Sequence, residues 1–277
     1  MKNKNKIFTR FGFYLFILAF LLIIIFPFYY ELITSIKTPD DIFSAFSLIP
    51  SKITFNSYKL VFINRPFARF LMNSFVISSL TTLIALAIAC FSAYAIARLK
   101  FKGKSIILGL VLAVSMFPQI ATISPIYMFM KDAGLRDTYA GLVIPYITFA
   151  LPLAIWNLTI FFKQIPFELE EAARIDGASV IQTFFRVILP LAGPGTFTTA
   201  ILVFIAAWNE YLYALTINTK EIRKTVPVAI SMFQGQFTVP WGEVSAATIV
   251  VTVPLIIMVL LFQKRIVSGL TSGAVKG

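Results

Sequence analysis

Long apolar runs without charge alternate with short charged segments along this chain. Each of six such runs has at least 20 residues, and about 20 helical residues cross the hydrocarbon core of a bilayer. The pattern predicts an all-α, polytopic membrane protein with six transmembrane helices in a single domain over residues 1–277. The runs cover residues 11–30, 70–97, 105–130, 138–162, 187–209 and 244–263.

A seventh uncharged run, residues 225–242, is interrupted by polar and helix-breaking residues. Unpaired backbone groups are costly in hydrocarbon, so such a stretch makes a poor lipid-facing helix. We interpret it as a loop outside the membrane. The interrupting residues are Pro227, Gln234, Gly235, Gln236, Pro240 and Gly242.

The composition also indicates a membrane protein. The chain is 58% hydrophobic and 13% charged, with a mean hydropathy of +0.87, whereas soluble domains carry about 25% charged residues. The formal charge of +12 comes from Lys and Arg spread along the loops, so it does not predict nucleic-acid binding. Basic residues of this kind hold cytoplasmic loops on their side of a lipid membrane.

The chain offers little catalytic or metal-binding chemistry. It has no His, and Cys90 is its one cysteine, which excludes an intramolecular disulfide, a Cys/His metal cluster and the commonest general base. Residues 101–105 end like a phosphate-binding loop, but Arg98 stands where that loop needs its first Gly. We therefore expect no enzyme activity, no cofactor and no metal site, and we expect any ATP to bind a separate subunit.

Residues 163–190 form a charged island between the apolar runs, and its first half has the features of a short helix. Pro166 suits the first position of a helix, and the acidic residues that follow favour the positive end of the helix dipole. Glu170 and Arg174 lie four residues apart and can pair on one face. Gly177 can adopt the left-handed conformation that ends a helix.

The second half of the island predicts another short helix. Ser179 and Gln182 have the spacing of a capping box, and we expect Pro190 to stop the helix that they open. Charges at this density cannot lie in hydrocarbon, so the island must fold on an aqueous face of the membrane. The exposed small pair Ala172-Ala173 would let another protein surface approach closely.

The island resembles the cytoplasmic coupling loop of ATP-binding-cassette importer permeases. The family signature is Glu-Ala-Ala, three residues, Gly, nine residues, Ile, one residue and Leu-Pro. The chain matches it with Glu171-Ala172-Ala173, Gly177, Val187 and Leu189-Pro190, and Val for Ile is the one departure. The resemblance implies that this helical hairpin, the candidate coupling loop (residues 163–190), docks on a separate ATPase. The residues that it assigns to this coupling are Glu171, Ala172, Ala173, Arg174, Asp176, Gly177, Leu189 and Pro190.

The basic residues predict the orientation of the spans. Residues 1–10 carry four basic and no acidic side chains, and no small-residue cleavage site follows, so we expect an uncleaved first span with a cytoplasmic N-terminus. Six spans then return the C-terminus to the cytoplasm, and they place the basic turn 98–104 and the candidate coupling loop on the same side. Because that loop ends at residue 190, we set the fifth span at residues 192–215.

The end of the fifth span carries the candidate pathway residues Trp208, Asn209, Glu210 and Tyr211. In a continuous helix Trp208 and Tyr211 would share a face, and aromatic rings and amides suit the faces and hydroxyls of sugars. The alternatives are an aromatic belt at the membrane interface and, for Glu210, a solvated span end. The prolines within spans, Pro118 among them, are either tolerated kinks or bends that shape a pathway.

Further stretches resemble the smaller permease subunit of maltose-type and multiple-sugar importers. The resemblance implies a carbohydrate cargo, a heterodimer with a second, larger permease, a dimeric ABC ATPase and an extracytoplasmic sugar-binding protein. It also implies the cytoplasmic membrane of a bacterium or an archaeon. The stretches are Asn73-Ser74 and residues 134–139, 208–215, 225–228 and 269–277.

Two other functions stay open. A permease of the same superfamily could carry an amino acid or glycerol phosphate, although an anionic cargo would favour Arg or Lys in the spans, and the six runs contain neither. A secondary transporter would be expected to show an intramembrane ion relay or inverted repeats, and we find no repeat in the sequence.

Overall fold

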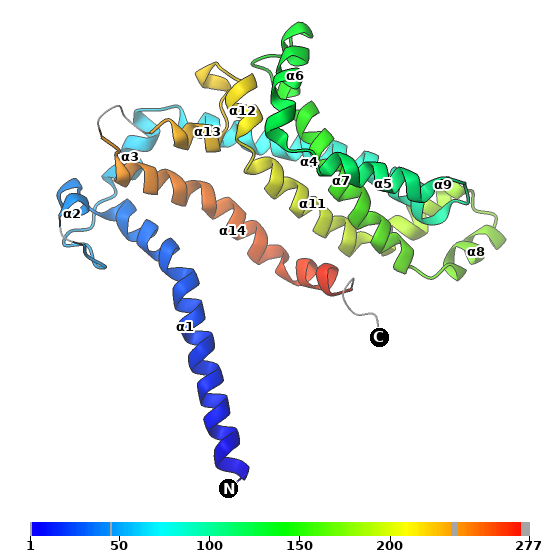
Figure 1. The fold of residues 1–277 in the computed structure, drawn as a ribbon, viewed down its shortest axis with the longest axis horizontal. Helices are drawn as coiled ribbons and strands as arrows, with labels where there is room; N and C mark the ends of the chain where they lie inside the picture. Colours follow the sequence, from blue (N-terminus) through cyan, green and yellow to red (C-terminus); the bar gives the residue numbers. More distant parts are fainter. Residues whose placement is uncertain (1, 45, 234–237, 273–277) are drawn as a thin grey trace. The chain divides into compact units, whose positions relative to one another are not determined.

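The computed structural model describes residues 2–44, 46–233 and 238–272, and the regular structure in these ranges is helical, without a strand (Figure 1). The all-α prediction is therefore confirmed. The helices are α1 (Lys2–Ile36), α2 (Pro39–Phe43), α3 (Asn56–Ile63), α4 (Phe67–Arg98), α5 (Lys104–Ser115), α6 (Gln119–Asp132), α7 (Tyr139–Gln164), α8 (Glu168–Ile175), α9 (Val180–Thr183), the π-helical η1 (Phe184–Ile188), α10 (Leu189–Leu191), α11 (Gly193–Trp208), α12 (Leu212–Ile217), the 3₁₀ turn η2 (Glu221–Arg223), α13 (Val226–Ser231) and α14 (Trp241–Ser272).

Four helices are long and apolar enough to cross a membrane by themselves. They lie in residues 10–36, 67–98, 139–164 and 241–263. Two further candidates are bent pairs, α5 with α6 and the helical run 180–191 with α11, so the described residues hold four spans, or up to six if each bent pair counts as one. The six predicted runs all fall on these helices, and the number of spans stays a prediction.

The chain divides into two compact units. One comprises residues up to 66 together with 230–253, and the other comprises residues 67–229 together with those from 254 onward. In the second unit α4 packs along α7, and α11 packs against both (Figure 1). Ala85, Ala89 and Ala93 recur every fourth residue of α4 and are fully buried, because small residues at this spacing let apolar helices approach closely.

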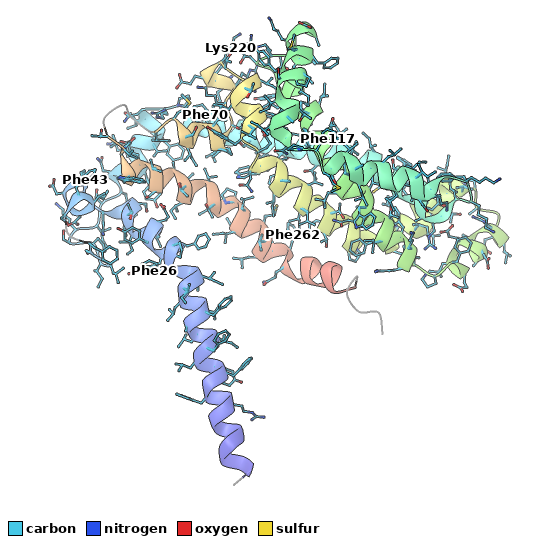
Figure 2. The ribbon with its side chains drawn as sticks, viewed as in Figure 1. Phe26, Phe43, Phe70, Phe117, Lys220 and Phe262 are labelled. Atoms are coloured by element: carbon cyan, nitrogen blue, oxygen red, sulfur yellow. The ribbon has the colours of Figure 1, made fainter. Side chains whose placement is uncertain are left out.

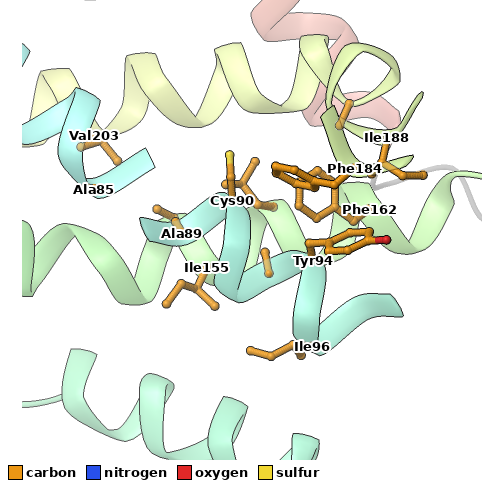
Figure 3. Close-up of a cluster of buried hydrophobic side chains, with 14 of the residues drawn as sticks. Ala85, Ala89, Cys90, Tyr94, Ile96, Ile155, Phe162, Phe184, Ile188 and Val203 are labelled. Atoms are coloured by element: carbon orange, nitrogen blue, oxygen red, sulfur yellow. The ribbon is translucent and has the colours of Figure 1, made fainter. Parts of the chain in front are cut away.

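A cluster of buried side chains joins α4 and α7 to the segment that follows α9 (Figure 3). The Phe184 ring lies 5.0 Å from the ring of Tyr94 and 6.4 Å from that of Phe162, measured between centroids. Ile188 and Val203 are also fully buried in this cluster. The core of this unit therefore includes one arm of the candidate coupling loop.

The predicted third span, residues 105–130, is not one straight helix. α5 and α6 meet at an angle of 91°, with Phe117 at the bend (Figure 2). Pro118 has an extended backbone at this bend. Proline has no N–H to donate to a continuing helix, and it disfavours helical geometry in the residue before it, so a helix break at this position is expected. By contrast, Pro125, Pro145 and Pro152 lie inside helices.

The predicted loop over residues 225–242 contains the short helix α13. Val226, Val228 and Ala229 of this helix are fully buried. Its six residues are too few to give a recognisable helical period, which explains why the sequence pattern missed it. Gln234 and Gln236 in the same run, and the last five residues of the 269–277 motif, lie outside the described residues.

Candidate functional site

The first arm of the candidate coupling loop is α8, an acidic helix. Glu168, Glu170 and Glu171 lie in its first turn, as expected from the dipole. The Phe167 carbonyl accepts the N–H groups of Glu170 and Glu171 at 3.0 and 3.2 Å. Pro166 was predicted to be the first residue of this helix, but the helix begins two residues later, at Glu168. Pro166 lies in the connection between α7 and α8.

The turn after α8 is closed as predicted at Gly177. This residue has a φ of +81°, and its N–H donates to the Arg174 carbonyl at 3.0 Å. The next N–H, of Ala178, donates to the Ala173 carbonyl at 2.9 Å. These two bonds form a Schellman motif, which needs a left-handed residue at this position.

The second arm opens with the predicted capping box. The Gln182 N–H donates to the Ser179 hydroxyl at 3.3 Å, and the Ser179 N–H donates to the Gln182 side-chain carbonyl at 2.8 Å. Both bonds satisfy N–H groups that a helix start would otherwise leave unpaired.

The prediction that Pro190 stops this second helix is wrong. The helix continues to Leu191 and bends by 76° at Ala192, before α11. The preceding turn, Phe184–Ile188, is π-helical, and its wider path moves a carbonyl that would otherwise clash with the proline ring. Pro190 is therefore accommodated within the helix.

The outer surface of the hairpin is formed by the turn and one face of α8. Glu171, Ala172, Arg174, Asp176 and Gly177 are exposed, whereas Ala173 is half-buried. Leu189 packs against the buried cluster, away from that surface, and Pro190 is exposed on the second arm. The structure thus gathers five of the eight predicted coupling residues on one accessible surface.

Two exposed isoleucines extend this surface, and the sequence analysis missed them. Ile175 is 86% exposed and Ile181 is 69% exposed. An apolar side chain inside a charged segment was the available signal. Exposed apolar groups beside small residues are typical of a surface that docks on another protein.

The other face of α8 carries a buried ion pair. Glu170 is fully buried, and its carboxylate lies 3.0 Å from Nε of Arg98, the last residue of α4. The predicted pairing with Arg174 is also present, at 3.8 Å. Nη2 of Arg98 donates to the Ile165 carbonyl, and its guanidinium lies 5.6 Å from the centre of the Phe167 ring.

The predicted pathway residues do not share one helix, so the predicted common face of Trp208 and Tyr211 is wrong. α11 ends at Trp208, and α12 begins at Leu212. At this break the Asn209 side-chain amide donates to the Ile205 carbonyl at 2.9 Å. Such local bonds from Asn compete with a helical backbone, and this accounts for the interruption.

Glu210 caps the N-terminus of α12. Its carboxylate accepts the N–H groups of Tyr213 and Ala214 at 2.9 and 3.2 Å. A negative charge at this end of a helix is stabilising. Glu210 is half-buried, and its role as a span end or as a pathway residue stays a prediction.

A pocket of about 120 Å³ lies beside Glu210. It is lined by Gln119, Tyr146, Phe149, Ala150, Leu153, Val203, Ala206, Ala207 and Glu210. Trp208, Asn209 and Tyr211 do not line it; Trp208 is 3% exposed and stacks on Phe204. Gln119, the first residue of α6, and Tyr146 line this pocket, so they join Glu210 as candidate pathway residues.

Asp137, in the turn before α7, binds a segment far along the chain. Its carboxylate accepts the N–H groups of Thr219 and Lys220 at 2.6 and 2.8 Å. Burial raises the pKa of this carboxyl, but the two N–H bonds and the Thr219 hydroxyl outweigh it and hold the pKa below its ordinary value. Asp137 also has a φ of +57°.

In residues 2–44, 46–233 and 238–272 no group of three His, Cys, Asp or Glu side chains is placed to hold a metal ion. The candidate sites are thus a helical hairpin and a small, mostly apolar pocket with a few polar groups, among them Gln119 and Glu210.

Comparison with known proteins gives close relatives over nearly the whole chain. The trehalose transport system permease protein SugB of Mycobacterium tuberculosis is 50% identical over 232 residues, 83% of this chain and 85% of SugB. The trehalose/maltose transport system permease protein MalG of Thermococcus litoralis is 45% identical over 259 residues, 92% of this chain and 93% of MalG.

The fold also matches a solved structure. It is a bacterial ABC transporter involved in import of the acidic polysaccharide alginate, with a TM-score of 0.81 at 23% identity, covering 94% of this chain and 97% of that one. Residues 85–272 match the model of the binding-protein-dependent transport system inner membrane component. With its several apolar helices, the chain belongs to this family of multi-pass membrane transport subunits.

Proposed function

We propose that this chain is the membrane-spanning permease subunit of an ATP-driven carbohydrate importer. The names of the two relatives, for trehalose and for trehalose and maltose, support a neutral sugar as cargo. The six apolar runs contain no Lys or Arg, which is consistent with a cargo that needs no fixed cation.

The candidate coupling loop carries this proposal. A helix held on a packed core, with Ala172 and Gly177 accessible at its turn, is suited to enter a cleft of another protein. We place a dimeric ABC ATPase there, with a second permease as heterodimeric partner and an extracytoplasmic sugar-binding protein on the opposite side. Closure of the ATPase on ATP would pull the hairpin and rock the spans between inward-facing and outward-facing states.

The orientation follows from the basic residues. Both termini, the 98–104 turn and the candidate coupling loop lie in the cytoplasm. The segments 31–69 and 217–243 then lie outside, and the second of these faces the binding protein.

The pocket beside Glu210 contributes part of the sugar pathway. Its volume of about 120 Å³ is below the roughly 300–1,000 Å³ of pockets that enclose a small-molecule ligand. A disaccharide therefore needs further walls, and the second permease supplies them. Glu210 and Gln119 can hydrogen-bond sugar hydroxyls, and Tyr146 and Phe149 offer ring faces.

The test uses the complete transporter in liposomes, with trehalose or maltose and the loaded binding protein. Ala172→Asp should leave the complex assembled but abolish sugar-stimulated ATP hydrolysis, because a charge and added bulk block the close contact. Ala133→Asp, the same change at an exposed residue after α6, should keep stimulation. Full stimulation with Ala172→Asp would refute the coupling role, and stimulation only by a loaded amino-acid-binding protein would refute the carbohydrate.

A further inference from the structure

We propose that Arg98 is a positioning residue that locks the first arm of the candidate coupling loop to α4, so that the two move together during transport. The inference rests on the proposed function, because it assigns a route by which a pull on the hairpin reaches a membrane-spanning helix. It starts from the ion pair between Arg98 and Glu170.

The burial of both partners makes this contact unlike an ordinary surface pair. The Arg98 side chain is 5% exposed and that of Glu170 is not exposed at all. Surface ion pairs hold two elements together weakly, whereas removal of one partner of a buried pair leaves the other charge unpaired away from water. Neutralising either Arg98 or Glu170 should therefore disturb the contact between α8 and the end of α4.

Arg98 makes further contacts beside the ion pair. Its Nη2 donates to the Ile165 carbonyl, and the Phe167 ring lies near its guanidinium. The contact of its Nε with the Glu170 carboxylate, at 3.0 Å, is an ion pair without hydrogen-bond geometry. One rigid, planar group thus holds both the connection before α8 and the helix itself. A lysine could offer the charge but not the fork.

The second arm is attached to the same helix by a different kind of contact. The Phe184 ring lies 5.0 Å from that of Tyr94 on α4 (Figure 3). It also lies 5.1 Å from the ring of Phe91 on the same helix. The hairpin is therefore fastened to α4 at two points, one ionic and one aromatic. Two attachments prevent the hairpin from pivoting about either one.

The test compares Arg98→Gln and Glu170→Gln in the complete transporter in liposomes, and measures sugar imported per ATP hydrolysed. Both changes remove one charge. Glu170→Gln keeps the side-chain shape, whereas Arg98→Gln also shortens the side chain and removes the donor to the Ile165 carbonyl. In the complex that assembles, this ratio should fall about tenfold, within the usual range of coupling between sites, while basal ATP hydrolysis continues. Arg98→Lys should give an intermediate ratio. Lys100→Gln, at an exposed residue just beyond α4, should stay within about twofold of wild type.

A purely structural role predicts another result. The amount of complex would fall, but each complex would import sugar with the wild-type ratio, and this would overturn the proposal. A wild-type ratio in both variants, or loss of all complex in both, would also overturn it. The wild-type transporter is measured first, so that failure to import any sugar counts against the proposed function and not against the role of Arg98.

Discussion

Asp137 joins two constraints in a single residue. A left-handed backbone is costly for residues with a Cβ, but Asp and Asn tolerate it better than others. The same residue holds the N–H groups of Thr219 and Lys220, 82 and 83 residues further along the chain. Asp therefore suits this position in both backbone and side chain.

The lowered pKa of Asp137 predicts a pH dependence of the attached segment. A carboxyl with a lowered pKa in the folded state stabilises it above the ordinary value of about 4, and this stabilisation is lost as the pH falls through the lowered pKa. The protection of the amides of residues 217–225, measured as exchange relative to the intrinsic rate at the same pH, should decrease below about pH 4. Asp137→Asn should remove this dependence, and an unchanged acid response in that variant would contradict the assignment.

Gly177 gives a second prediction at this scale. Gly177→Val should cost about 1–2 kcal/mol for the left-handed backbone, with more for the β-branch, and should lower sugar-stimulated ATP hydrolysis by disordering the turn. Gly177→Asn should retain most of it, since Asn adopts this conformation. No atom lies within 4 Å of a Cβ built at Gly177, so equal losses in both variants would point to a crowded partner surface instead.

Local chemistry was predictable residue by residue, and distant pairing was not. The bonds between Ser179 and Gln182 follow from a spacing of three residues. The pairing of Glu170 with Arg174 follows from a spacing of four residues. The shorter contact of Glu170, with Arg98, joins residues on separate helices. No single-sequence pattern reports which charge is buried.

At the scale of elements, the long apolar helices were predictable, because an uncharged apolar run of about 20 residues indicates a membrane helix, whereas a short run does not distinguish a helix from a strand. Their breaks were harder to place. Pro118 marks the bend between α5 and α6 and was recognised only as one of several prolines. The break after Trp208 depends on bonds made by Asn209 and Glu210, and their residue types alone do not distinguish a cap from a pathway group.

The cap on α12 predicts an outcome for Glu210→Ala. Loss of an N-terminal cap costs about 1 kcal/mol, so the amides of Tyr213 and Ala214 should exchange about fivefold faster. Asn209→Ala should leave both amides unchanged, because its side chain bonds to Ile205 on α11. Exchange that is unaffected by Glu210→Ala would show that the carboxylate does not hold the helix.

Sugar uptake separates the cap from the pathway. If Glu210→Ala speeds exchange in α12 but leaves sugar uptake unchanged, then Glu210 acts only as a helix cap and not in the pathway. Uptake within about twofold of wild type for Asn209→Ala and Tyr211→Ala would leave those two residues to the interface belt.

At the scale of the whole molecule, the class of protein was predictable and the division of the chain into two units was not. Periodicity and composition identify membrane helices. They do not report how a chain divides, because packing between distant helices decides that. No residue in the most apolar part of α1 is buried within the chain, consistent with contacts to lipid or to another subunit.

The orientation of the spans gives the prediction for this scale. In a Cys90→Ala background, an impermeant thiol reagent added from outside should label a Cys placed at Asn56 and should not label one placed at Ile181. Both positions are exposed in the structure, and Ile181 avoids the capping bonds of Ser179. The control is labelling of the Cys at Ile181 after the cells are permeabilised, which shows that this position can react. Labelling at Ile181 in intact cells would contradict the predicted orientation.

The buried ion pair also sets an order of events during synthesis. The carbonyl that Arg98 binds lies 67 residues further along the chain, so a ribosome working at about 5–20 residues per second needs roughly 3–13 s to supply it. During that interval α4 has entered the membrane with a guanidinium that has no final partner. The nascent chain must keep that end of the helix in water until α7 has been threaded. A stalled chain that ends before Glu170 would leave the Arg98 guanidinium without its partner carboxylate.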